Sequence, residues 1–221
     1  MSLIDIISEY VSQNIKDLEC KYSWNINYND VPVELRNNRN ESLYVQNKKL
    51  RNSLHSYLLI CDEVKKIDII KWYIYSWGGI KRNSLETIRN YTYSSTECII
   101  SKEDRGISSW SKALSIRNPK KFCIYDSRVA SSLNSLQLIH NFDDPIYFPA
   151  LTSRNKIILK SIKNRKYLKE SWQKSDKKTF YNYYLNLLDS IALKVGNGVD
   201  KHDIEMLLFA DAENLVKKSL Q

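Results

Sequence analysis

Glycine and proline are scarce in this chain of 221 residues, which has five Gly and four Pro. An all-β protein usually uses more of both in its turns, so the composition favours a helical protein. Hydrophobic residues still make up 43% of the chain, enough to build a sizeable core. Five glycines cannot supply the glycine-rich loops that bind nucleotide phosphates, so that class of enzyme is excluded.

Cysteine and histidine are also few, and neither forms a metal-binding pattern. The four cysteines are far apart and form no C-x-x-C pair, and the three histidines are scattered. We therefore expect no metal site, no cofactor and reduced thiols, as in a cytoplasmic protein. The opening MSLIDIISEY carries acids where a signal peptide would be basic, and no apolar run is long enough to span a membrane.

Two common catalytic patterns are missing as well. No G-x-S-x-G turn is present, so a serine hydrolase is not expected. The acid pairs Asp62-Glu63 and Asp143-Asp144 stand alone, whereas a two-metal nuclease needs three or four converging acids. Both pairs are interpreted as solvated positions.

Positive charge is what the chain has in excess, with a net charge of +9. Almost all of the excess lies in one segment, residues 154–178, where ten Lys and Arg face two acids for a net +8. The ten are Arg154, Lys156, Lys160, Lys163, Arg165, Lys166, Lys169, Lys174, Lys177 and Lys178. Such a local patch favours a polyanionic partner such as DNA, and the alternative is a generally basic protein.

Hydrophobic spacing predicts helices along most of the chain. They are expected within residues 3–18, 46–64, 65–77, 84–91, 105–116, 126–140, 154–171, 180–195 and 200–220. The fold class is therefore all-α. A helical domain over 65–140 is expected, with N-terminal helices in 1–64 and basic and C-terminal helices in 141–221 forming a second lobe.

The segment FCIYDSRV, residues 122–129, is the most informative stretch for chemistry. An apolar run leads directly into Asp126, and a helical pattern begins immediately after it. Asp126 is either only the N-cap of that helix, or a carboxylate held at the edge of a pocket to do chemistry. The two roles are compatible.

The region from Arg105 to Leu136 resembles the core of the helix-hairpin-helix base-excision DNA glycosylases. In that family a glycine-containing hairpin leads into a helix, a short link and a P-V-D-x-H/R-V run with the catalytic Asp. Here IYDSRV matches this run, so the resemblance assigns Asp126 as the catalytic acid. Gly106, twenty positions earlier, corresponds to the second hairpin glycine.

The hairpin departs from the family pattern in two respects. The usual L-P-G-V/I-G is EDRGI here, and Ser108 stands where members with lyase activity carry a lysine. Lys112 lies one turn further on. The resemblance therefore implies a monofunctional glycosylase without a Schiff-base lysine, acting in DNA repair or in antiviral defence against phage with modified DNA.

The same resemblance implies two helical lobes with a cleft between them and a set of substrate-binding residues. A flipped base would stack on aromatic walls, for which Tyr125, Trp110 and Trp77 are the candidates, although each also suits a core position. The residues expected to contact DNA are Gly106, Ser108, Lys112, Arg117, Lys120, Lys121, Arg128, Lys163, Arg165 and Lys166. The partner is double-stranded DNA with a modified or damaged base, and the protein is expected to be a monomer without a membrane association.

Two other classes of function remain open from the sequence. One is a non-catalytic nucleic-acid-binding protein that uses the basic segment 154–178 alone. The other is a helical protein-interaction module whose charge is incidental.

Overall fold

The computed structural model describes residues 1–34, 40–174 and 176–220. The expected segments 1–64 and 141–221 therefore include a few residues outside the described part, namely 35–39, 175 and 221. Helices make up most of the described chain, which confirms the all-α prediction, and the only described strands form one short parallel pair. In the described residues, no helix combines the length and the apolar character needed to cross a membrane.

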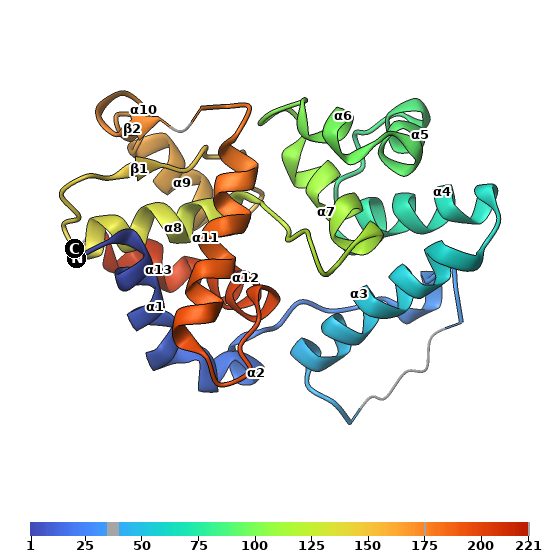
Figure 1. The fold of residues 1–221 in the computed structure, drawn as a ribbon, viewed down its shortest axis with the longest axis horizontal. Helices are drawn as coiled ribbons and strands as arrows, with labels where there is room; N and C mark the ends of the chain where they lie inside the picture. The colour runs from blue at the N-terminus through green and yellow to red at the C-terminus, as the bar shows by residue number, and fades with distance from the viewer. Residues whose placement is uncertain (35–39, 175, 221) are drawn as a thin grey trace. The chain divides into compact units, whose positions relative to one another are not determined.

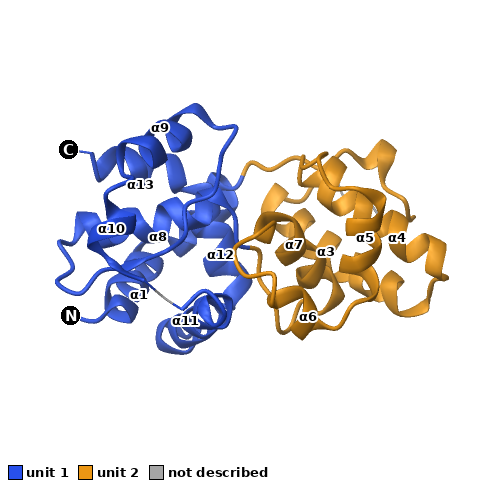
Figure 2. Ribbon diagram, turned by 90° about the horizontal axis from the view of Figure 1, so that it is seen from above, with its two compact units in different colours: residues 1–22, 125–221 blue, residues 23–124 orange. Residues whose placement is uncertain are grey.

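The chain divides into two compact units, which Figure 2 colours separately. Unit 1 consists of residues 1–22 and 125–221, and unit 2 consists of residues 23–124. Unit 1 therefore combines the N-terminal and the C-terminal parts of the chain. The boundaries differ from the expected 65–140 domain, because residues 23–64 belong to unit 2 and the helix after Asp126 belongs to unit 1.

Unit 1 is a group of helices around α8, which packs against α1, α9, α12 and α13. Its elements are α1 (Leu3–Asn14), η1 (Ile15–Asp17), α2 (Leu18–Lys21), α8 (Ser127–Ile139), β1 (Ile146–Tyr147), α9 (Lys156–Asn164), α10 (Leu168–Ser171), β2 (Gln173–Lys174), α11 (Phe180–Val195), α12 (Lys201–Ala210) and α13 (Ala212–Lys218). Every residue of α8 from Val129 to Gln137 is buried, so α8 is the central helix of the unit.

Polar side chains of α8 are buried because they bind backbone groups of other segments. Asn134 exchanges two hydrogen bonds with the backbone of Phe148, at 2.9 and 3.0 Å. Gln137 does the same with Ile146, at 2.9 and 2.8 Å. Buried backbone groups must be paired. The side-chain amides of Asn134 and Gln137 therefore take the place of a neighbouring strand for the backbone of residues 146–148.

Unit 2 contains the other helices and centres on α7. Its elements are η2 (Tyr28–Asp30), α3 (Leu43–Ile60), α4 (Glu63–Trp72), the π-helical turn η3 (Tyr73–Trp77), α5 (Leu85–Tyr93), α6 (Thr96–Ile100) and α7 (Ile107–Arg117). Helix α7 is buried along almost its whole length and packs against α3, α5 and η3. Ser84 caps α5 through the Thr87 amide, and α5 begins within the expected helix 84–91.

Some of the expected helices are divided in the structure, and the one expected over 65–77 changes from α4 to the π-helical turn η3 at Tyr73. The helix expected over 3–18 is divided into α1, η1 and the start of α2. The basic segment forms α9 and α10, which are separated by a turn. The last helix breaks at Asp211, which has φ −92° and ψ 5°. Asp211 is buried and its carboxylate accepts a hydrogen bond from the Tyr10 hydroxyl at 2.8 Å. Burial raises the pKa of Tyr10, and the charge of Asp211 adds to the rise.

Candidate functional site

Asp126 begins α8 as its N-cap residue. Its backbone is extended, with φ −139°, and one carboxylate oxygen, Oδ1, accepts both the Arg128 amide at 2.9 Å and the Val129 amide at 3.1 Å. The cap interpretation of Asp126 is therefore confirmed. The two amides fix the direction of the carboxylate at the start of α8. The residue as a whole is half-buried.

A residue that the sequence analysis missed, Glu213 of α13, joins the starts of α8 and α9. Its Oε1 accepts a hydrogen bond from Arg128 Nη2 at 3.2 Å and one from Asn155 Nδ2 at 2.6 Å. Asn155 is the N-cap of α9, because its Oδ1 accepts the amides of Ile157 and Ile158. The helix start that carries Asp126 is thus tied to the beginning of the basic segment. No local pattern signals this role, since Glu213 lies 85 residues after Arg128.

Arg128 was expected to contact DNA, and its charge is used inside unit 1. Besides its bond to Glu213, its guanidinium lies over the ring of Phe209 at 5.1 Å from the centroid. The side chain is 23% exposed. In this conformation Arg128 therefore positions the start of α8 and leaves only part of its surface for a ligand.

Tyr125, a candidate wall of a base pocket, lies in the core of unit 1. It is fully buried, and its hydroxyl donates to the Pro149 carbonyl at 3.0 Å. Its ring meets Phe180 and Tyr184 edge to face, at centroid distances of 4.9 and 5.2 Å. These contacts give Tyr125, the residue directly before Asp126, a packing role in the core of unit 1.

The basic segment separates into exposed residues and one buried residue. Lys163, Lys166 and the other basic side chains of the segment are exposed, whereas Arg165 is only 7% exposed. Arg165 donates to Ser135 Oγ at 2.9 Å and Ser219 Oγ at 2.7 Å, and to a backbone carbonyl of α13. Burial lowers its pKa below the usual arginine value. Arg165 therefore links α9 to α8 and α13. It was expected from the sequence to contact DNA.

In unit 2, the predicted hairpin is a turn over residues 101–106 between α6 and α7. Gly106 immediately precedes α7 in the left-handed region, with φ 70° and ψ 15°, and Glu103 also has a positive φ of 59°. A Cβ at Gly106 would meet the Tyr91 hydroxyl at 3.0 Å. Gly106 is exposed and Ser108 is half-buried. The turn therefore requires glycine at position 106 for both its dihedral angle and its space.

The four basic residues predicted around the hairpin fall into two pairs. Lys120 and Lys121 are exposed. Lys112 is 5% exposed and its Nζ donates to the Ser108 carbonyl at 3.1 Å. Arg117 donates to the carbonyls of Tyr91 and Ser94, both at 2.9 Å, and burial lowers its pKa. Lys120 and Lys121 thus present their charges on the surface, whereas Lys112 and Arg117 bind carbonyls within unit 2.

The two tryptophan candidates belong to the core of unit 2. Trp110 is fully buried, and its indole donates to the Arg105 carbonyl at 3.2 Å. Trp77 is 8% exposed, stacks on Tyr73 at 4.2 Å and donates to Asn47 Oδ1 at 2.8 Å. Their buried indole groups are satisfied, as expected for core tryptophans.

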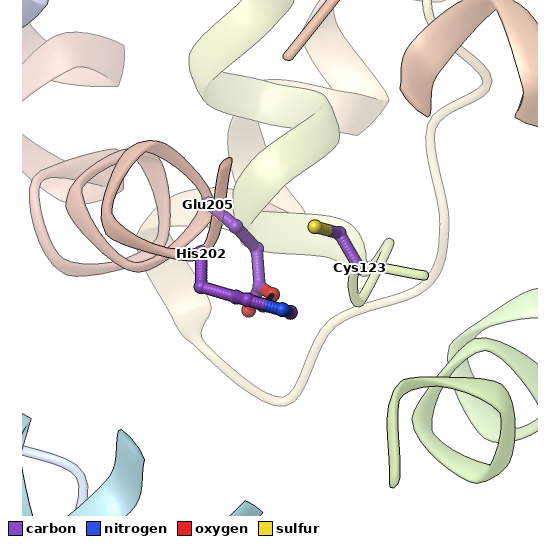
Figure 3. A group of neighbouring side chains, drawn as sticks. All are labelled: Cys123, His202 and Glu205. Atoms are coloured by element: carbon purple, nitrogen blue, oxygen red, sulfur yellow. Dashed lines mark ion pairs between the residues drawn. The ribbon is translucent and has the colours of Figure 1, made fainter. Parts of the chain in front are cut away.

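Unit 1 also contains a His–Glu pair that the sequence analysis did not single out. His202 and Glu205 lie one turn apart on α12, with Nδ1 of the imidazole 3.6 Å from Oε2 of the carboxylate (Figure 3). Cys123, drawn in the same figure, belongs to unit 2.

Comparison with protein-family models, with curated proteins and with solved structures gave no match to this chain.

Proposed function

We propose that this protein is a DNA glycosylase that hydrolyses the N-glycosidic bond of a damaged or modified base, with Asp126 as its catalytic residue. The observation that supports it most directly is the Asp126 carboxylate, fixed by two amides at the start of a buried, central helix. The helix-hairpin-helix glycosylase fold is part of this proposal. So are the binding of double-stranded DNA, the monomeric state and the cytoplasmic location.

The reaction needs one well-positioned carboxylate. As the bond between C1′ and the base nitrogen breaks, the base leaves with the bonding electrons and the sugar becomes oxocarbenium-like. A carboxylate facing C1′ stabilises this positive charge, and the oxygen of a water molecule then bonds to C1′. One proton of that water is released through the carboxylate, and the departing base is protonated. A charge held on a helix start costs little reorganisation during the reaction, which is the condition for effective electrostatic catalysis.

Phosphate binding would come from the basic segment, which begins close to the start of α8. Glu213 ties Asn155 to Arg128, and the neighbours of Asn155 in sequence, Arg154 and Lys156, are both exposed. A DNA strand bound along these cations would run toward the helix start that Asp126 caps. Phosphate contacts of this kind position a duplex without reading its sequence.

The experiment is the Asp126→Asn substitution. Asparagine caps a helix about as well as aspartate, so the variant keeps the fold of α8 and loses only the charge. Base release is measured as free base by mass spectrometry and as alkali-labile sites. The substrates are duplex oligonucleotides that each carry one uracil, hypoxanthine, alkylated purine, oxidised guanine or hydroxymethylated cytosine. On any substrate that the parent cleaves, we expect Asp126→Asn to reduce the rate by about 100-fold or more.

The matched control is Asp62→Asn, which removes the charge of another N-cap, at the start of α4 in unit 2. This variant should release base at the parental rate. The proposal is wrong if Asp126→Asn is as active as the parent, or if the parent releases no base from any of these substrates. A parent that binds DNA without releasing base would support the alternative, a non-catalytic nucleic-acid-binding protein. That alternative is favoured by the exposed lysines of the basic segment.

A further inference from the structure

The turn between α9 and α10 presents an aromatic side chain in the middle of the basic segment. Tyr167 is 56% exposed, although the buried Arg165 lies two residues before it and the buried Leu168 directly after it. Large aromatic side chains usually bury most of their surface, and the hydrophobic stripe of α9 does not include this one. Its exposure is therefore a feature to be explained.

The lysines of α9 lie on one side of the helix, opposite its packed face. Ile158 and Ser161 are buried, and Ile158 belongs to a cluster with Ala212 and Val216 of α13. The exposed lysines 156, 160 and 163 are spaced four and three residues apart, which places them in one row along α9. Tyr167 follows Lys163 after four more residues, and Lys166 and Lys169 on either side of it are exposed.

The backbone that carries Tyr167 is anchored on both sides. Before it, the Arg165 guanidinium is bonded to Ser135 and Ser219. After it, Leu168 is 2% exposed, and Gln173 of β2 donates to the Pro145 carbonyl at 2.9 Å. A ring on such an anchored turn loses little additional freedom when a ligand stacks on it, and this favours binding.

We propose that the surface formed by the exposed lysines of α9, by Lys166 and Lys169 and by Tyr167 binds single-stranded DNA. The lysines bind consecutive phosphates, and the Tyr167 ring stacks on an unpaired base. Proteins that bind single strands without sequence preference combine these two features, a basic track and an aromatic platform. In a duplex the base faces are already stacked on one another, so no unpaired base is available to stack on the Tyr167 ring.

This inference goes beyond the proposed function, because it adds single-stranded DNA to the duplex that the proposed function assigns to unit 1. It is measured by binding alone, so its outcome is separate from that of base release. Failure of the glycosylase proposal would leave this surface unaffected, and the reverse also holds.

The test is fluorescence anisotropy with a labelled 15-nucleotide oligo-dT and with a 15-base-pair duplex. Tyr167→Ala should weaken oligo-dT binding by about 5- to 100-fold, the loss expected for one stacked base, and should change duplex binding by less than about twofold. Tyr167→Phe keeps the ring and should bind as the parent does. The matched control is Tyr93→Ala, which removes another exposed tyrosine, in unit 2.

A second variant tests the lysines. Exchanging Lys160, Lys163 and Lys166 for Gln should lower affinity for oligo-dT, and the slope of log affinity against log salt should become shallower by about 2. The inference is overturned if Tyr167→Ala binds oligo-dT as the parent does, or if its affinities for oligo-dT and for the duplex fall by the same factor. An unchanged salt slope in the triple variant would overturn it as well.

Discussion

Replacing Arg165 with alanine is expected to destabilise unit 1, whereas the same change at the neighbouring Lys163 or Lys166 is not. Arg165 is 7% exposed, and its guanidinium makes short hydrogen bonds to Ser135 and Ser219. A hydrogen bond from a charged donor contributes about 1.5–3 kcal/mol, and the desolvation of the guanidinium opposes part of this. We expect the free energy of unfolding to fall by about 2–4 kcal/mol in Arg165→Ala. For an exposed lysine the change should stay within about 0.5 kcal/mol.

The assay must report on unit 1, because the chain has two compact units. Four of the five tryptophans lie in unit 2, so tryptophan fluorescence would report mainly on the wrong part. Hydrogen exchange of peptides from α9 and α13, measured along a urea titration, reports on the elements that Arg165 joins. Equal urea midpoints for Arg165→Ala and the parent would refute the reasoning. The reasoning would also be refuted if Lys163→Ala lowered the free energy of unfolding as much as Arg165→Ala, because burial would then not distinguish the two positions.

Two further predictions concern the hairpin turn and the N-terminus. Gly106→Ala places a Cβ at φ 70° and 3.0 Å from the Tyr91 hydroxyl, so it should lower the free energy of unfolding of unit 2 by about 1–2 kcal/mol, measured by urea titration with tryptophan fluorescence. An unchanged urea midpoint would contradict this account of the turn. The pKa of Asp5 lies well below its usual value, because the Lys194 ammonium and the Ser2 amide bind its carboxylate. Its contribution to stability is therefore present above the unfolded pKa of about 4 and is lost as the pH falls. Lys194→Ala should raise the Asp5 pKa toward its usual value in an NMR titration, and an unchanged titration would show that Lys194 does not hold it down.

The sequence by itself determined the helical class and most helix positions. Apolar spacing and caps are local signals, and they identified the helices after Ser84 and Asp126 because a cap binds amides only two or three residues away. Gly106 was singled out only through the family resemblance, and the structure gives it a φ of 70°, which favours glycine. The local signals also identified Asp126 as a helix cap, and its catalytic role stays a proposal.

The tertiary structure decided which side of each helix meets the core. Arg165 and Lys166 are adjacent basic residues with the same charge, yet one is buried and one is exposed. Their difference depends on Ser135 and Ser219, which lie at least 30 residues away in the chain. Likewise, Glu213 links the starts of α8 and α9 only because α13 packs against both helices. Burial and pairing of this kind depend on distant segments meeting, and periodicity within one segment carries no information about them.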